Sequence, residues 1–337
     1  MTNPARIILA TEPDGSFGTG GRSWMSVDSM QIARLLGERG LQASTVRIDR
    51  LLDLDLRQND RIFYASAFNP DFRGYIRDIL YFAGRRAKLV PGYELLLAHE
   101  NKGFQELLKA SLGIGNLEGR YGVDFDERSM HPPYVFKTST GAGSAGVHLV
   151  RGARDERRIQ ARYFARPFLA RLKALVRRRK LKPEELDRYL FYYKPFRPYV
   201  TQRFVEGLTG DLKILVFGDR FYTLWRENRP GDFRASGSGR LDFDRPASAG
   251  ALDFARDVAE RLGSPYVSLD IAEGRDGHHL LEFQALYFGP TTLTLSNGYY
   301  VSRSGAWERV SAEPNLEESF AHAIAYHLRG SAEAASP

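Results

Sequence analysis

Two acidic residues lie in segments that otherwise predict buried strands. Asp270 is in the apolar segment 267–271, and Glu282 is in the segment 279–283. A buried carboxylate is costly unless it is ion-paired or bound to a metal, and Mg²⁺ prefers such oxygen ligands. Glu282 and Gln284 are two residues apart and so share one face of a strand. The pattern predicts a magnesium site formed by Asp270, Glu282 and Gln284. An ion pair between either acid and an arginine is the alternative.

A glycine-rich segment, 136–150, contains a literal G-x-G-x-x-G at Gly141, Gly143 and Gly146. The segments before and after the glycines both predict strands, whereas a dinucleotide-binding turn must open a helix. No Gly-Lys-Ser/Thr ends the run, so a P-loop is also excluded. The segment therefore predicts a hairpin with Lys137 at its root. The hairpin either binds phosphate, through backbone amides and the lysine charge, or is a plain turn.

Two arginines, Arg226 and Arg234, follow in segments rich in charged and small residues. A guanidinium group can bind a carboxylate or a phosphate through two parallel hydrogen bonds. We expect both arginines to bind the carboxylate of an acceptor substrate. For Arg234, a solvated loop arginine is the alternative.

These residues form part of a longer ordered series of motifs. The series is Lys102, Lys137 with its hairpin, Gln202–Val205, Asp211-Leu-Lys213, Arg226, Phe233–Ser236, Asp270 and Glu282-Phe-Gln284. The order resembles the ATP-grasp superfamily, and most closely its branch of ribosomal-protein glutamate ligase, glutathione synthetase and D-alanine–D-alanine ligase. The resemblance spans nearly the whole chain up to Gln284. It implies an α/β (α+β) ATP-grasp fold, with a small Rossmann-like N-terminal domain and a nucleotide-clamping body of two subdomains.

The resemblance also implies roles for individual residues, with ATP and Mg²⁺ as the bound groups. The implied ATP-binding residues are Lys102, Lys137, Gly141, Gly143, Ser144, Gly146, Gln202, Arg203, Phe204, Val205 and Asp211. The implied catalytic residues are Lys137, Arg226 and Arg234, and the implied metal ligands are Asp270, Glu282 and Gln284. Three positions depart from the family pattern: Lys213 replaces an arginine, Ser236 an asparagine and Gln284 an asparagine.

The reaction implied by the resemblance is ATP-dependent joining of a carboxylate to an amine, through an acyl phosphate, to give an amide, ADP and phosphate. Such chemistry needs mainly positioning and charge neutralisation, so the lack of cysteine is no obstacle. Two alternatives keep the same nucleotide site. One is a kinase that phosphorylates a small-molecule or glycan hydroxyl, and the other is a nucleotide-binding protein without turnover.

Three segments and a tail must position these residues. Strands and helices alternate over residues 1–92, which predicts a small parallel α/β domain. Residues 93–199 are expected to form a central subdomain with the hairpin and a basic helical insertion. Residues 200–330 are expected to form a mostly β subdomain with the magnesium site, and 331–337 a loose tail.

Composition bounds the remaining possibilities. The chain has 337 residues, a net charge of +7 and no long apolar run, so neither a transmembrane helix nor a signal peptide is expected, and a cytoplasmic location fits. The charge is local, because the segment Arg151–Lys182 has thirteen basic and two acidic residues. An arginine-rich helix there is either a solvated face or a surface for an acidic polymer or a membrane. A homodimer is a further possibility.

Overall fold

The computed structural model describes residues 5–18, 26–65, 69–115, 117–125, 130–141, 144, 146–165, 172–173, 176–178, 180–192 and 196–333. The chain divides into two compact units. The first unit comprises Met1–His99, Leu108–Asn116 and Glu206–Pro337, and the second comprises Glu100–Leu107 and Leu117–Val205. The first and third predicted segments thus fall mostly in one compact unit, while the predicted domain boundaries stay a prediction.

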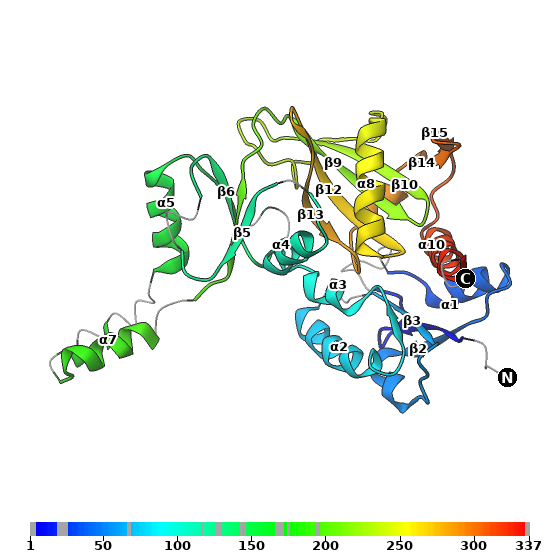
Figure 1. Cartoon of the computed structure of the whole chain (residues 1–337), viewed down its shortest axis with the longest axis horizontal. Coiled ribbons are helices and arrows are strands. Elements are labelled where there is room, and N and C mark those ends of the chain that lie inside the picture. The colour runs from blue at the N-terminus through cyan, green and yellow to red at the C-terminus, as the bar shows by residue number, and fades with distance from the viewer. Residues whose placement is uncertain are drawn as a thin grey trace. The chain divides into compact units, whose positions relative to one another are not determined.

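The elements in chain order are shown in Figure 1. The strands are β1 (Ile7–Thr11), β2 (Ala43–Arg47), β3 (Arg61–Tyr64), β4 (Lys88–Val90), β5 (Gly119–Gly122), β6 (Tyr134–Thr138), β7 (Val147–Val150), β8 (Tyr199–Arg203), β9 (Gly210–Phe217), β10 (Arg220–Glu227), β11 (Leu241–Asp242), β12 (Tyr266–Gly274), β13 (Gly277–Gln284), β14 (Gly298–Arg303) and β15 (Ala306–Ser311). The helices are α1 (Ser29–Gly37), η2 (Ile48–Asp53), α2 (Pro70–Ala83), α3 (Tyr93–Ala98), α4 (Lys102–Ser111), α5 (Ala153–Ile159), η3 (Gln160–Phe164), α7 (Pro183–Tyr192), α8 (Ala249–Leu262), α9 (Thr291–Thr294) and α10 (Leu316–Glu333).

The first unit begins with a parallel four-stranded sheet in the order β2-β1-β3-β4. Its first helix, α1, is capped at its N-terminus by Asp28, whose carboxylate accepts hydrogen bonds from the backbone amides of Met30 and Gln31. The strand order reverses between β1 and β3, because β2 lies on one side of β1 and β3 on the other. The predicted parallel α/β architecture is confirmed for this segment.

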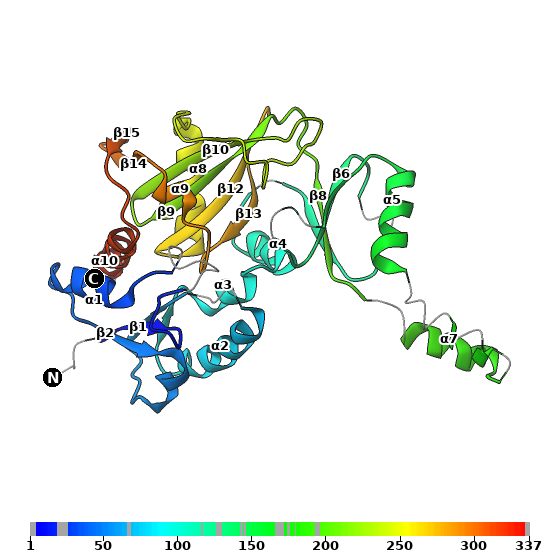
Figure 2. The same cartoon turned by 180° about the vertical axis from the view of Figure 1, so that it is seen from behind.

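A seven-stranded sheet follows in the order β13-β12-β9-β10-β14-β15, with β11 paired to β10. Helix α8 lies against β9 and β12 on one face, as Figures 1 and 2 show from opposite sides. Residues alternate between the faces of a strand, and Leu215 and Phe217 of β9 belong to a core cluster shared with α10. The same face also carries Asp211 and Lys213, which lie earlier on β9. One face of this sheet is therefore apolar at one end and charged at the other.

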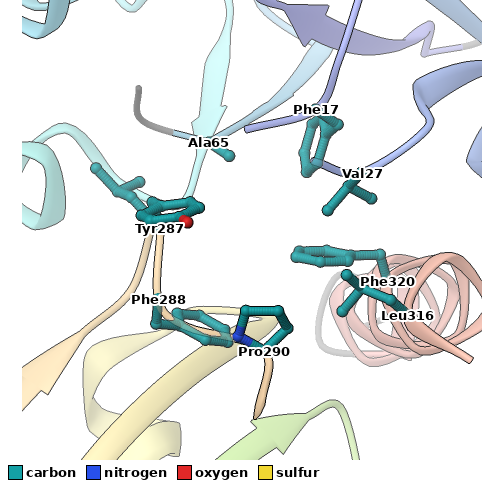
Figure 3. Close-up of a pocket in the computed structure, with 9 residues that line it drawn as sticks. Phe17, Val27, Ala65, Tyr287, Phe288, Pro290, Leu316 and Phe320 are labelled. Atoms are coloured by element: carbon teal, nitrogen blue, oxygen red, sulfur yellow. The ribbon is translucent and has the colours of Figure 1, made fainter. Parts of the chain in front are cut away.

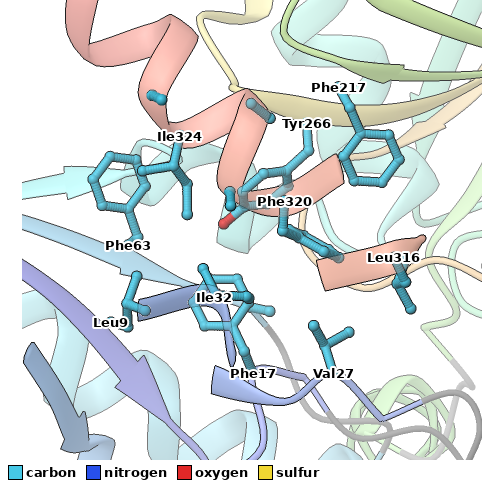
Figure 4. Close-up of a cluster of buried hydrophobic side chains, with 14 of the residues drawn as sticks. Leu9, Phe17, Val27, Ile32, Phe63, Phe217, Tyr266, Leu316, Phe320 and Ile324 are labelled. Atoms are coloured by element: carbon cyan, nitrogen blue, oxygen red, sulfur yellow. The ribbon is translucent and has the colours of Figure 1, made fainter. Parts of the chain in front are cut away.

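The core of the first unit joins distant parts of the sequence (Figure 4). Leu9 of β1 and Phe17 belong to the same buried cluster as Phe217, Tyr266 and Phe320 of α10. The rings of Phe17 and Phe320 meet edge to face, with centroids 5.6 Å apart. The shared cluster makes the N-terminal sheet and the seven-stranded sheet parts of one packed body.

The second unit is built on a four-stranded antiparallel sheet in the order β5-β8-β6-β7. Phe136 and Tyr199 stack in its aromatic core, at 5.4 Å between ring centroids. Strands β6 and β7 form the hairpin predicted from the glycine-rich segment, so this prediction of strand–loop–strand is confirmed.

Two features differ from the sequence predictions. The sequence pattern of residues 94–112 predicts one helical stretch, but the structure divides it into α3 and α4, because His99 is extended and Glu100 adopts a left-handed backbone with φ of 50°. The strands β5, β11, β14 and β15 were not predicted. In the predicted basic segment Arg151–Lys182, the structure describes α5, η3 and isolated residues, while residues 166–171, 174, 175 and 179 lie outside the described part. No described helix combines the length and apolar character needed to cross a lipid bilayer.

Candidate functional site

Four charged side chains and one serine gather at the polar end of the seven-stranded sheet, in a group that we call the sheet cluster: Asp211, Lys213, Arg226, Ser268 and Asp270. Strand register positions them. Asp211 of β9 lies opposite Arg226 of β10, and Lys213 lies opposite Asp270 of β12. Directly opposed residues of antiparallel strands point to the same face of the sheet, so backbone pairing alone brings these side chains together.

Arg226 is held between two carboxylates of the sheet cluster. Its Nε and Nη2 donate to the two oxygens of Asp211 at 2.7 and 2.8 Å, and its Nη2 lies 2.9 Å from Oδ2 of Asp270. Lys213 Nζ donates to the other oxygen of Asp270 at 3.1 Å and to Ser268 Oγ at 2.7 Å. The ion pair that the sequence left as an alternative is therefore present for Asp270.

The two carboxylates of the sheet cluster differ in protonation behaviour. Burial acts to raise the pKa of Asp270, but the positive charges of Arg226 and Lys213 outweigh it and hold this pKa well below its ordinary value. Burial and the neighbouring negative charge of Asp270 raise the pKa of Asp211, despite the attraction of Arg226. Burial opposes the charged form of Arg226, yet the two carboxylates raise its pKa above the ordinary value. The guanidinium thus stays charged in a buried position.

Two metal-ligand candidates continue the row of polar side chains onto β13. Glu282 pairs with Asp270, and Gln284 pairs with Ser268. Because opposed residues share a face, Asp270, Glu282 and Gln284 present oxygen atoms on the same side of the sheet.

A second polar group, which we call the lysine cluster, lies in the second unit and consists of the charged residues Lys102, Glu106 and Lys137 and the neutral Gln202. Lys137 Nζ donates to Oε1 of Gln202 at 2.6 Å, and Nε2 of Gln202 donates to Oε1 of Glu106 at 2.7 Å. Gln202 is only 1% exposed. One buried amide therefore connects a cation to an anion, and the two contacts fix which way the amide points.

Lys102 joins the lysine cluster to the glycine-rich hairpin. Its Nζ donates to the carbonyl oxygen of Gly141 at 2.6 Å, and its backbone amide donates to the carbonyl of Ser139 at 2.9 Å. Both lysines are buried in the structure. The second unit therefore places two lysine side chains beside the hairpin and its root.

The hairpin needs glycine at Gly146 for two reasons. Its φ is 75°, a left-handed conformation that side chains disfavour, and an added Cβ would lie 2.3 Å from Oγ1 of Thr138. Ser144 also has a positive φ, of 64°. Gly143 lies outside the described residues.

Known structures share this arrangement of elements. D-cycloserine synthetase DcsG matches with a TM-score of 0.52 and 12% identity, over 96% of this chain and 99% of that chain. ATP-grasp ligase PsnB, complexed with a minimal precursor, Mg and ADP, matches with a TM-score of 0.51 and 16% identity, over 97% and 99%. D-alanine–D-alanine ligase from Bacillus anthracis, complexed with ATP, matches with a TM-score of 0.50 and 12% identity, over 98% and 99%.

The chain has the ATP-grasp fold. The fold class predicted from the sequence is confirmed. No protein-family model matches the sequence, and no curated protein matches it at a significant level. At these identities the likeness establishes the fold alone, so the residues themselves must carry any statement about chemistry.

Within the ATP-grasp fold, the predicted metal ligands suit Mg²⁺. Among the described residues, no group of three or more histidines, cysteines and acids could hold a metal ion alone. Mg²⁺ commonly takes only one or two carboxylates and completes its shell with phosphate oxygens and water. Asp270, Glu282 and Gln284 offer that kind of incomplete oxygen set. A bound Mg²⁺ would neutralise phosphate charge there.

Arg234 is held by its own loop. Its Nη2 lies 2.6 Å from Oδ2 of Asp232. The hydrogen bonds between the Arg234 guanidinium and the Asp232 carboxylate lower the pKa of Asp232 and raise the pKa of Arg234. Arg229, in the same loop, donates to the carbonyls of Ser236 and Gly237. Contact of Arg234 with a substrate stays a prediction.

The resemblance to the ATP-grasp superfamily implies that the backbone of Gln202–Val205 contacts the adenine of ATP. Some groups of this segment already make hydrogen bonds within the protein. The backbone amide of Arg203 donates to the carbonyl of Glu118 at 2.8 Å. Phe204 is half-buried and Val205 is buried. Adenine binding by this segment also stays a prediction.

Glu106 was missed in the sequence analysis. It lies four residues after Lys102 on α4, and residues at this spacing share a helix face. Its approach is possible because an added Cβ at Gly119 would lie 2.3 Å from Oε2 of Glu106. The helical spacing from Lys102 was the signal that could have identified it.

Proposed function

We propose that this protein is an ATP-dependent carboxylate–amine ligase that uses Mg²⁺. One observation carries the proposal: in an ATP-grasp fold, a buried arginine held by two carboxylates lies beside a lysine and a row of oxygen ligands. Phosphoryl transfer from ATP requires such fixed charges more than it requires a protein nucleophile.

The proposed reaction has two steps. A carboxylate oxygen of the first substrate attacks the γ-phosphorus of ATP, and the bond from that phosphorus to the bridging oxygen breaks, giving an acyl phosphate and ADP. The nitrogen of the amine substrate then attacks the acyl carbon. The carbon–oxygen bond to the phosphate breaks, so that amide and phosphate form and the amine gives up a proton.

The residues have separate tasks in this proposal. Lys102 and Lys137 bind phosphate oxygens of ATP, helped by amides of the hairpin. Arg226 stabilises negative charge that develops on the transferred phosphoryl group, since Asp211 and Asp270 fix the orientation of its guanidinium in advance. Arg234 binds the carboxylate substrate after exchanging its Asp232 partner.

A hydroxylamine trap tests the proposal. The protein is incubated with Mg-ATP, hydroxylamine and a pool of amino acids and dicarboxylic acids, and hydroxamates and ADP are measured. Hydroxylamine converts an acyl phosphate into a hydroxamate, so a ligase yields hydroxamate with stoichiometric ADP and an Arg226→Ala variant yields far less. A phosphorylated hydroxyl compound without hydroxamate would identify a kinase instead. ATP binding without ADP release across the pool would overturn the ligase proposal in favour of a non-catalytic protein.

The basic segment Arg151–Lys182 fits the same proposal as a docking region for a large acidic substrate or a membrane surface. Its supporting observation is its charge, together with exposed apolar side chains such as Val176 at its described positions. Ligase activity that falls with salt only for acidic polymeric substrates would support this role, because screening weakens exposed charge pairs.

A further inference from the structure

Apolar side chains of the first unit pack into its core. Around Phe17, Phe288 and Phe320, for example, only a water-sized gap remains between the side chains (Figure 3). Helix α7 of the second unit is different, because none of its ten residues is buried. Its apolar side chains therefore have little share in a core, and the surface that they form requires another explanation.

Exposed apolar residues are concentrated in α7 and beside it. Fifteen large apolar residues are exposed in the described part of the chain, and five of them lie between positions 172 and 196: Leu172, Val176, Phe191, Tyr192 and Phe196. Phe191 and Tyr192, in the last turn of α7, are 63% and 78% exposed. The rings of Phe191 and Phe196 meet edge to face, with centroids 5.4 Å apart. A group of exposed apolar residues of this kind is typical of an interaction surface.

The same stretch is basic. The described residues between positions 172 and 197 include seven basic and three acidic ones. The acids, Glu184, Glu185 and Asp187, lie in the first half of α7, away from the aromatic pair that ends the helix. Arg177 lies over the ring of Tyr189, 4.3 Å from its centroid, and so joins the residues before α7 to the helix. The charge of this surface is therefore complementary to a negatively charged partner.

We call this surface the basic–aromatic patch and define it by Val176, Arg177, Arg188, Phe191, Tyr192 and Phe196. A membrane with anionic headgroups suits both of its properties, because basic side chains attract the headgroups and apolar side chains insert at the boundary with the acyl chains. A second copy of the chain suits it less, since a two-fold contact would bring like charges together.

A single-stranded nucleic acid also suits the patch less than a membrane does. Such a partner stacks its bases on open ring faces. Arg177 covers a face of the Tyr189 ring, and the aliphatic side chains of Leu172 and Val176 have no ring to offer. Aliphatic and aromatic groups alike can instead insert among lipids.

We propose that the basic–aromatic patch docks the protein on an anionic lipid surface, with Phe191, Tyr192 and Phe196 inserted among the headgroups. Because no described helix is able to cross a bilayer, the contact is peripheral. The inference assigns one partner to the docking region of the proposed function. A role in reaching a membrane-bound substrate rests on that function, whereas lipid binding itself does not.

The test measures co-sedimentation of the full chain, without ATP, with vesicles of phosphatidylcholine alone or of equal parts phosphatidylcholine and phosphatidylglycerol. The wild type is expected to bind the anionic vesicles at least about tenfold more tightly, and added salt is expected to weaken this binding. The double variant Phe191→Ser/Tyr192→Ser is expected to bind the anionic vesicles at least about tenfold more weakly, because two rings are lost from the apolar contact.

A matched control is available on α2, where Tyr81 and Phe82 form another adjacent pair of exposed aromatic residues. Tyr81→Ser/Phe82→Ser is expected to bind vesicles as the wild type does. Melting temperatures show which variants fold. If the double variant in α7 does not fold, Phe191→Trp provides the test, because brominated lipid in anionic vesicles is expected to quench its added fluorescence relative to the wild type.

Equal binding of the wild type to both kinds of vesicle would overturn the inference, as would undiminished binding by the folded α7 variant or a lack of quenching in Phe191→Trp. Binding to polyglutamate or to single-stranded RNA, without binding to vesicles, would also overturn it and identify an acidic polymer as the partner. Hydroxamate formation without vesicle binding would reject the lipid surface alone. Vesicle binding of the expected pattern without ATP turnover would reject the ligase proposal alone.

Discussion

His327 on α10 is expected to make the stability of the first unit depend on pH. Its ring meets the ring of Phe63 edge to face, with centroids 6.3 Å apart. Burial, together with the positive charges of Arg61 and Lys88, lowers the pKa of His327 from 6.5 to about 4. The folded protein therefore holds this histidine neutral under conditions in which the unfolded chain binds a proton.

The sign and size of the effect follow from proton linkage. Above pH 6.5 both states leave His327 neutral, and its full contribution to stability is present. As the pH falls from 6.5 towards 4, only the unfolded state gains the proton, so stability decreases by about 1.4 kcal/mol for each pH unit. Between pH 7.5 and pH 5 the loss amounts to about 2 kcal/mol, and the total at still lower pH is about 3 kcal/mol.

The assay compares urea unfolding of the wild type and of His327→Gln at pH 7.5 and pH 5. We expect the wild type to lose about 2 kcal/mol more than the variant over this interval. His131→Gln, at an exposed position, is the matched control and should follow the wild type. If His327→Gln and the wild type lose stability in parallel, or if NMR shows that His327 titrates near 6.5, the reasoning from burial is wrong.

Three further predictions concern the charged clusters and the hairpin. Glu106→Ala should raise the KM for ATP about tenfold with kcat little changed. Glu106→Gln should raise this KM less, because the hydrogen bond to Gln202 survives. Equal KM values in the wild type and both variants would contradict this prediction. Asp211→Asn, which removes one of the two anions holding Arg226, should lower kcat at least about tenfold in an ADP-release assay, and an unchanged kcat would argue against the assigned role. Gly146→Ala should destabilise the hairpin by about 1–2 kcal/mol and weaken ATP binding in calorimetry; wild-type affinity would show that the loop conformation does not matter.

The sequence predicts elements best where local patterns and packing agree. Strands were expected before and after the glycines of the hairpin, and β6 and β7 lie there, because β-branched and aromatic residues flank a glycine-rich turn. The strand β15 was missed because most of its residues are exposed and two adjacent ones, Glu308 and Arg309, are charged. Pairing with β14, which no local sequence pattern predicts, stabilises β15.

The candidate site shows the same limit. The sequence identifies Asp270 as a carboxylate in an apolar strand, and it leaves an arginine partner or a metal as alternatives. The choice of Arg226 and Lys213 as partners depends on the register of three strands, which local patterns do not determine. The hydrogen bonds that join Lys137 to Glu106 through Gln202 likewise depend on packing between residues 65 and 96 positions apart.

The shared core of the first unit has a consequence for synthesis of the chain on the ribosome. Phe17 packs against Phe320, so the hydrophobic interior that supports the earliest strand contains residues from the last helix. Until α10 emerges from the ribosome, Phe17, Phe217 and Tyr266 of the nascent chain lack a major packing partner. Completion of this body must therefore wait until α10 has been synthesised, and premature termination before Leu316 would yield a product with an exposed aromatic surface prone to aggregation.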